Sequence, residues 1–124
     1  MLKNDQPKQS LLFHCAAGKD RTGVAGFLIL TALGVDYDTI KQDYILTNIV
    51  YSTFDQDTLR KRLQNDKAEE FVNQMNAAFQ VQGDTLDVAK QAILDNYGDY
   101  GNYFVKAMGL SEADLNDLRR IYLT

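Results

Sequence analysis

SLLFHCAAGKDRTG, residues 10–23, lies between a polar beginning and the long apolar run 24–33. Residues 10–14 are short and apolar on both faces, which predicts a buried parallel strand. The run 24–33 is apolar nearly all round, which predicts a helix buried on most sides. The order is therefore strand, tight loop, helix. A loop in that setting presents backbone N–H groups at the start of a helix, where anions bind.

The loop combines a thiol with a guanidinium. A helix N-terminus and nearby positive charge favour the thiolate of Cys15, which is the nucleophilic form. Arg21 carries a planar fork that holds two phosphate oxygens at once. Gly18 and Gly23 suit sharp bends or close packing, and the Thr22 hydroxyl can donate to the sulfur or cap the first turn of the helix. We therefore expect a phosphate held in front of the sulfur.

The spacing His-Cys-x5-Arg-Thr resembles the signature loop of the protein tyrosine phosphatase superfamily. The longer string Gly-Lys-Asp-Arg-Thr-Gly is similar to that of bacterial tyrosine/serine phosphatases, whose family includes phosphoinositide phosphatases. Residues 32–36, 43–48 and 96–111 also resemble that family. The resemblance covers nearly the whole chain, but only the C-terminal portion of the family's catalytic domain.

The resemblance implies an α/β cysteine-phosphatase fold, of which this chain would be the mostly helical part with one strand. It implies a phosphomonoester hydrolase with a phosphocysteine intermediate, acting on phosphotyrosine or phosphoserine proteins or on phosphoinositides. The expected catalytic residues are Cys15, Arg21 and Asp20. The expected phosphate-binding residues are Ala16, Ala17, Gly18, Lys19, Asp20 and Arg21. The expected supports of the loop are His14, Thr22 and Gly23.

Asp20 has two candidate roles. The family's usual general acid lies upstream of the signature cysteine, so Asp20 is the best candidate within the chain to protonate the leaving group. Positive neighbours, however, favour the ionised carboxylate, which cannot donate a proton. Asp20 would then brace the loop. Lys19 resembles the loop lysine of phosphoinositide-directed relatives.

Other classes of protein fit the motif less well. An isolated His-Cys pair is usually a buried structural feature, but Gly18, Arg21, Thr22 and Gly23 in register favour a functional loop. A Walker loop is excluded because Asp20 follows Lys19 and Phe13 replaces the first glycine. Two alternatives to an enzyme stay open. One is a phosphate-binding module without turnover, and the other is a helical interaction fragment.

The bulk properties of the chain fit one domain. It has 124 residues, 45% of them hydrophobic, which is enough for a core. It has no secretory apolar region and no transmembrane candidate. One cysteine permits no internal disulfide, which suits a reducing cytoplasm, and the net charge of −4 argues against a nucleic-acid partner. No residue cluster has the spacing of metal ligands, and no cofactor is expected.

Apolar periodicity after residue 23 predicts helices throughout. A helix over 37–50 should turn one stripe toward the core: Tyr37, Ile40, Tyr44 and Thr47. The resemblance leaves open a role near the site for Tyr44 or Asn48. Further helices are expected over 67–80, 84–97 and 100–108, and a last one should begin at Ser111. The first two should each turn one apolar face to the core or to a partner: Phe71, Met75, Ala78 and Phe79 on the first, and Leu86, Ala89, Ile93 and Tyr97 on the second. Gly34, Asp36 and a Ser111/Asp114 capping box should bound them.

Two segments stand apart from this helical pattern. Residues 1–9 are polar and contain Pro7, which predicts a mobile lead-in. Residues 52–82 resemble the helical lid of some relatives, and the basic residues 60–62 in it are a candidate contact for acidic groups, although a solvated helix face is the simpler interpretation.

The predicted strand has no partner within the chain. Only 14 residues precede Cys15, whereas the family has several strands there. We therefore expect one of two arrangements. Either the chain is a fragment and a missing N-terminal segment completes the sheet, or a second copy does so in a homodimer.

Overall fold

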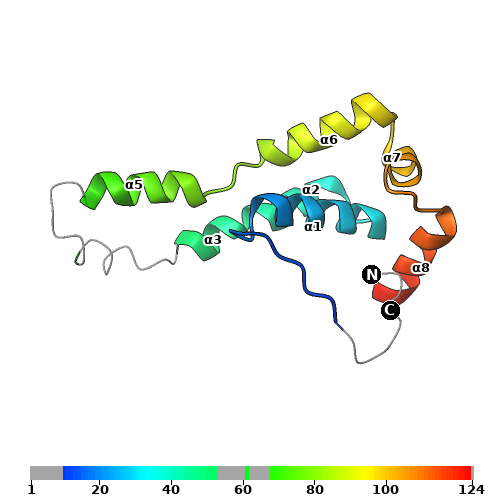
Figure 1. Ribbon diagram of the computed structural model, residues 1–124, viewed down its shortest axis with the longest axis horizontal. Helices are drawn as coiled ribbons and strands as arrows, with labels where there is room; N and C mark the ends of the chain where they lie inside the picture. The colour runs from blue at the N-terminus through cyan, green and yellow to red at the C-terminus, as the bar shows by residue number, and fades with distance from the viewer. Residues whose placement is uncertain (1–9, 53–60, 62–67, 124) are drawn as a thin grey trace.

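The computed structural model describes residues 10–52, 61 and 68–123. The described part is helical and has seven helices long enough to be named. Their bounds are α1 Asp20–Leu33, α2 Tyr37–Ile45, α3 Thr47–Ser52, α5 Ala68–Phe79, α6 Asp84–Tyr97, α7 Tyr100–Lys106 and α8 Glu112–Tyr122. Figure 1 shows α1 and α2 in the centre, with α6 above them and α8 beyond the C-terminal end of α1.

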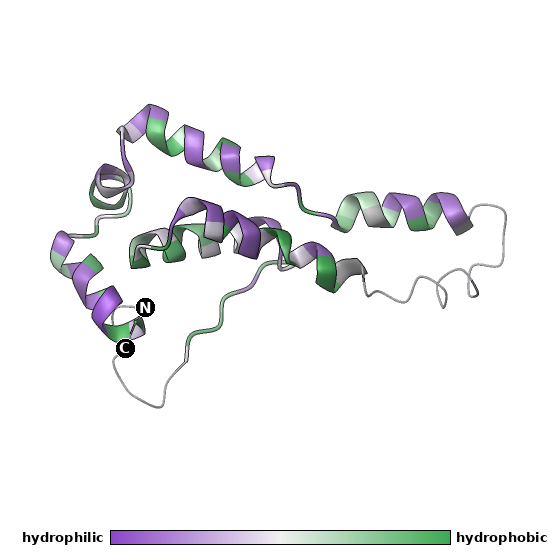
Figure 2. Cartoon of the chain, turned by 180° about the vertical axis from the view of Figure 1, so that it is seen from behind, coloured by the Kyte–Doolittle hydropathy of each residue, from purple (hydrophilic) through white to green (hydrophobic). Residues whose placement is uncertain are grey.

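The strand expected over residues 10–14 does not form in the described part of the chain. Residues 10–15 are extended but pair with no other described backbone, because every element that follows them is helical. Their apolar side chains therefore face solvent: Leu12 is 87% exposed and Phe13 is 42% exposed. Figure 2 shows this segment leading away from α1 with hydrophobic residues along it.

Local signals set several helix ends as expected. Gly34 ends α1 in the left-handed conformation, with φ of 94°. The Asp36 side chain accepts from the Thr39 N–H and begins α2. Ser111 and Asp114 form the expected capping box of α8.

The expected helix over 37–50 is divided at Leu46. The amide of Leu46 is shared by the carbonyls of Gln42, at 3.2 Å, and Asp43, at 3.1 Å, so the turn tightens there. The remaining chain forms α3. The first helix also differs from expectation, since it begins at Asp20 and includes part of the signature loop.

The core joins α1, α2 and α6. Phe27, Ile40, Tyr44, Leu86 and Ile93 are buried together in it, along with Val81. The stripe expected on 37–50 is therefore a core face, and so is the expected face of α6. A second cluster packs α1 against α7 and α8 through Ala32, Phe104, Leu115 and Leu118.

Two faces differ from expectation. On α5 Val72 is buried, whereas Phe71, on the face expected to be core or partner surface, is 43% exposed. On α1 only Phe27 and Ala32 are fully buried. The other side of α1 borders an apolar cavity of about 360 Å³ instead of being covered. Phe104, Met108 and Leu118 line the same cavity.

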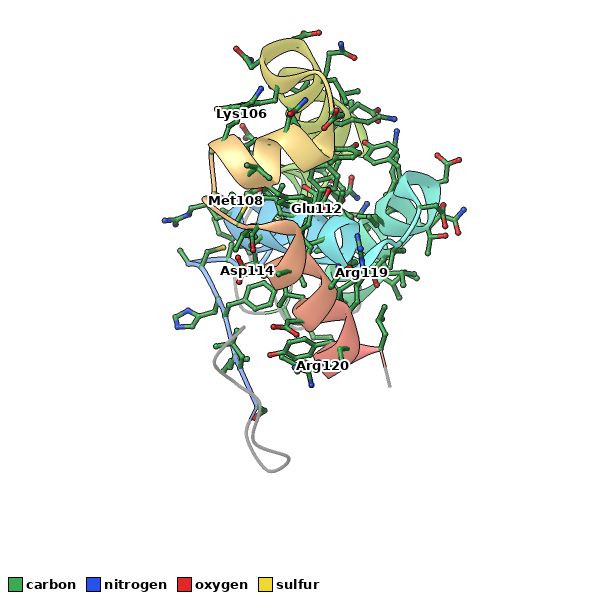
Figure 3. The ribbon with its side chains drawn as sticks, turned by 90° about the vertical axis from the view of Figure 1, so that its right-hand side faces the viewer. Lys106, Met108, Glu112, Asp114, Arg119 and Arg120 are labelled. Atoms are coloured by element: carbon green, nitrogen blue, oxygen red, sulfur yellow. The ribbon has the colours of Figure 1, made fainter. Side chains whose placement is uncertain are left out.

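Two polar contacts tie distant elements together. Arg119 of α8, labelled in Figure 3, donates from Nε to the Ala32 carbonyl at the end of α1, at 3.2 Å. The Asn48 amide bonds to both backbone groups of Val81, at 2.7 Å to its N–H and 3.0 Å to its carbonyl. This double contact fixes α3 beside the segment that connects α5 to α6.

The predictions for residues 1–9 and for the basic residues Arg60 and Arg62 lie outside the described residues, as does most of the segment that connects α3 to α5. None of the described helices is long and apolar enough to cross a membrane.

Candidate active site

The signature loop lies between the extended segment and the first turn of α1. Residues 16–19 form bends, Gly18 has a positive φ of 67°, and α1 begins at Asp20. A residue with a side chain would be strained at Gly18 because of that φ. The loop therefore turns back over the start of α1, where free N–H groups and the helix dipole favour an anion.

Cys15 is partly exposed and lies next to this helix start. The pKa of its thiol is lowered from 9.0 to about 6, chiefly by hydrogen bonds from the hydroxyl and the backbone N–H of Thr22. The backbone N–H groups of Ala17 and Gly18 lower it further, and desolvation opposes them. At neutral pH the sulfur is therefore mainly a thiolate.

Thr22 has a hydroxyl that is buried and bonds to no nitrogen or oxygen among the described residues. The Cys15 sulfur is thus the acceptor available to it. A buried hydroxyl without a partner is costly, so the arrangement favours the charged sulfur. Of the three residues expected to support the loop, Thr22 is the one that contributes most to lowering the pKa of Cys15.

Gly23, the second expected support, lies against α2. A methyl group on Gly23 would overlap Tyr44 Cε2 and would lie 2.8 Å from Tyr44 Cδ2. The Gly23 N–H also bonds to the Lys19 carbonyl at 2.7 Å, which closes the first turn of α1. Glycine is needed here because the ring leaves no room for a side chain.

His14, the third expected support, is exposed, and the structure gives its side chain no hydrogen bond to any described residue. The prediction that it bonds behind the loop therefore has no counterpart in the described part of the chain. Arg21 is exposed as well, on the first turn of α1, six residues beyond Cys15 along the chain.

Lys19 and Asp20 pair with each other. Lys19 Nζ is 3.0 Å from Asp20 Oδ1, with the Lys19 side chain 12% exposed and the Asp20 side chain 61% exposed. The aliphatic part of Lys19 is therefore packed while its ammonium group is held by its neighbour. Ala16 is exposed and Ala17 is half-buried in the same loop.

A cavity of about 210 Å³ lies beside the loop, between α1 and α2. Gly18, Lys19 and Thr22 line it from the loop, and Asp43 and Tyr44 line it from α2. The sequence left open a role for Tyr44 or Asn48 near the site. Tyr44 is the one that lies there, because Asn48 bonds to Val81 instead. The apolar spacing that places Tyr44 in the core could not reveal its contact with Gly23.

Metal binding finds no support in the described ranges, where no three side chains of His, Cys, Asp or Glu gather as metal ligands would. The positive groups that the described residues place at this helix start are backbone N–H groups, Lys19 and Arg21.

Comparison with known proteins matches the whole chain, residues 1–124, to the model of the tyrosine phosphatase family. The chain belongs to the tyrosine phosphatase family. A candidate tyrosine-protein phosphatase of Cupriavidus necator is 36% identical to it over 122 residues, which are 98% of this chain and 42% of that protein. The triple specificity protein phosphatase PtpB of Mycobacterium tuberculosis is 34% identical, over 91% of this chain and 44% of that protein.

The chain therefore spans less than half the length of the curated relatives that it matches. Membership of the family implies the cysteine-phosphatase fold, and the described part of this chain is helical within it.

Proposed function

We propose that this chain carries the nucleophile and the phosphate-binding loop of a phosphomonoester hydrolase. The observation that carries the proposal is the lowered pKa of Cys15, at about 6, beside a helix start that favours anions. A phosphate held by the loop N–H groups, Lys19 and Arg21 would present its phosphorus to a thiolate at that place.

The proposed reaction has two displacements. The Cys15 thiolate attacks the phosphorus, the bond from phosphorus to the ester oxygen breaks, and the leaving oxygen takes a proton. Water then attacks the phosphocysteine, the bond from phosphorus to sulfur breaks, and the products are inorganic phosphate and the Cys15 thiolate. Arg21 and the amides of residues 16–21 bind the three oxygens that the phosphoryl group keeps throughout.

For Asp20 we propose the bracing role. Its carboxylate oxygen Oδ1 is already engaged with Lys19 Nζ at 3.0 Å, within the loop itself. An aryl leaving group departs without help from an acid, whereas an alkyl leaving group needs a proton. Comparing the two kinds of substrate therefore distinguishes bracing from acid catalysis.

The substrates that fit are phosphoproteins with phosphotyrosine or phosphoserine, and phosphoinositides. The relative PtpB is named for triple specificity. The Lys19 ammonium group beside the loop supports an additional anionic group on the substrate, as an inositol phosphate has. A cysteine that must stay reduced also fits our proposal of a cytoplasmic location.

We propose that residues 1–124 form one part of a larger domain, with a helical portion from residue 24 onward. The unpaired extended residues 10–14, with Leu12 87% exposed, support completion of a sheet by a further segment or by a second copy of the chain. A phosphate-binding module with little turnover is the alternative function that this unpaired segment favours.

The deciding experiment is hydrolysis of p-nitrophenyl phosphate by this 124-residue chain, without metal and under reducing conditions, beside Cys15→Ser. We expect turnover that Cys15→Ser abolishes. A folded chain that binds vanadate but has no turnover would contradict the enzyme and support the binding module. Absence of both would contradict the two proposals together.

A further inference from the structure

Tyr44 of α2 packs directly against Gly23 of α1, at the end of the signature loop. Tyr44 is 6% exposed, and a methyl group on Gly23 would overlap its ring. The two residues are far apart in sequence, so the contact exists only because α1 and α2 pack together. The backbone of α1 at Gly23 cannot move toward α2 past this ring.

Gly23 directly follows Thr22, whose hydroxyl and N–H make the largest contributions to stabilising the Cys15 thiolate. Both residues belong to the first turn of α1, which the bond from the Gly23 N–H to the Lys19 carbonyl closes at 2.7 Å. A shift of Gly23 therefore moves Thr22, and the reach of its hydroxyl to the sulfur changes with it. Hydrogen bonds weaken steeply with distance and angle, so a small shift matters.

Tyr44 is itself held firmly. Its ring packs in the cluster of Phe27, Ile40 and Leu86, and its hydroxyl lies beside Thr85 of α6. The charged groups that face this hydroxyl are Lys19 and Asp20 from the loop and Asp84 from α6. Tyr44 thus reaches from the rigid core to the loop.

The Tyr44 ring also limits the size of the cavity beside the loop. The cavity of about 210 Å³ is bordered by Thr22, Gly23 and Tyr44. A smaller side chain at position 44 would enlarge that cavity, and the first turn of α1 would be free to shift into it.

We propose that Tyr44 is a positioning residue, whose ring presses against Gly23 and thereby holds Thr22 where its hydroxyl serves the Cys15 sulfur. The inference rests on the proposed function, because it assigns Tyr44 to the support of the nucleophile. The proposal assigns the support of Thr22 to the ring of Tyr44 and not to its phenolic hydroxyl.

The test measures the rate of Cys15 alkylation by iodoacetamide as a function of pH. Cys15 is the single cysteine of the chain, so the reagent reports on one site. The wild-type profile should reach half its maximum near pH 6. Tyr44→Ala should move that midpoint upward by about one pH unit or more, whereas Tyr44→Phe, which keeps the ring, should leave it within about 0.3 units.

Leu86→Ala is the matched control. Leu86 is fully buried in the same cluster but lies on α6 and does not line the cavity beside the loop. Leu86→Ala should lower the free energy of unfolding without moving the midpoint of the Cys15 alkylation profile. Equal shifts in Leu86→Ala and Tyr44→Ala, or equal shifts in Tyr44→Phe and Tyr44→Ala, would overturn the proposal, as would an unmoved midpoint in Tyr44→Ala.

Gly23→Ala tests the same contact from the other side and leaves the core side chains in place. Alanine favours a helix more than glycine does, so any upward shift of the midpoint comes from the overlap with Tyr44. We expect such a shift, and an unmoved midpoint in folded Gly23→Ala would overturn the proposal.

These alkylation experiments do not measure turnover. A wild-type thiol with a midpoint near pH 6 but no hydrolysis would therefore contradict the proposed function alone.

Discussion

Lys19 and Asp20 form an ion pair within the signature loop, with Nζ 3.0 Å from Oδ1. Asp20 is the first residue of α1, where a negative charge interacts favourably with the helix dipole. The pair therefore holds the Lys19 ammonium group at the same helix start to which a phosphate would bind. It gives Asp20 a structural task that needs no proton transfer.

Asp20→Asn should lower turnover of p-nitrophenyl phosphate and of a phosphoserine peptide by the same factor, roughly 3- to 10-fold. The reason is that a brace affects the loop, whatever the leaving group is. Steady-state kcat/KM for the two substrates measures the effect. Asp38→Asn, which changes an exposed acid in the first turn of α2, is the control and should have no effect. A much larger loss with the phosphoserine peptide would instead identify Asp20 as the general acid.

Thr22→Ala should raise the pKa of Cys15 from about 6 toward its ordinary value of 9.0, since the Thr22 hydroxyl is the largest cause of the lowering. The thiolate is the attacking form, so activity rises as pH increases through this pKa. The ascending limb of kcat/KM should therefore move to higher pH, and activity at pH 6 should fall about tenfold or more. Thr22→Ser keeps the hydroxyl, so its kcat/KM should rise over the same pH range as that of the wild type. An unmoved limb in Thr22→Ala would refute the role of the hydroxyl.

Asn48→Ala should reduce the free energy of unfolding by about 1–3 kcal/mol, because Val81 is buried and loses partners for both its N–H and its carbonyl. Urea denaturation measures the loss, and hydrogen exchange of the Val81 amide should accelerate at the same time. Asn96→Ala removes a bond from an exposed side chain to a carbonyl of its own helix. This control should cost less than about 0.5 kcal/mol.

Asp87→Asn should remove part of the acid sensitivity of the fold. Asp87 accepts from Tyr37, at 2.7 Å, and from Lys41, at 2.6 Å, and these bonds lower its pKa below 3.8. A carboxyl whose pKa is lowered on folding stabilises the protein above its unfolded pKa, and this stabilisation is lost as pH falls through the folded value. Thermal unfolding at pH 7 should show a Tm lower by roughly 3 °C. The difference from wild type should shrink below pH 4, and a difference that stays constant with pH would contradict the linkage.

The elements that the sequence predicted well depend on contacts between near neighbours. The Asp36 cap, the Ser111/Asp114 box and the end of α1 at Gly34 are each set by a few consecutive residues. The buried faces of α2 and α6 follow from apolar spacing along one helix. The bends of the loop and the lowered pKa of Cys15 likewise arise within residues 15–22. Local chemistry is enough to specify all of these.

The errors arose where a distant partner decides the outcome. The strand over residues 10–14 was predicted from an apolar run, but a strand exists only when another strand bonds to it. Periodicity on α5 placed Phe71 on the apolar face but did not show that packing buries Val72. The division at Leu46 carries no glycine or proline signal in the sequence.

The sequence by itself thus determined the chemistry of this protein: a thiol, a guanidinium and a glycine turn at the start of a helix, with the caps that bound most of the helices. Only the tertiary structure decided what holds that chemistry in place. Tyr44 meets Gly23, and Asn48 meets Val81, because packing α1, α2 and α6 around one core brings them together. Such contacts depend on how whole helices bury their apolar faces, and that information is not present in any short stretch of the chain.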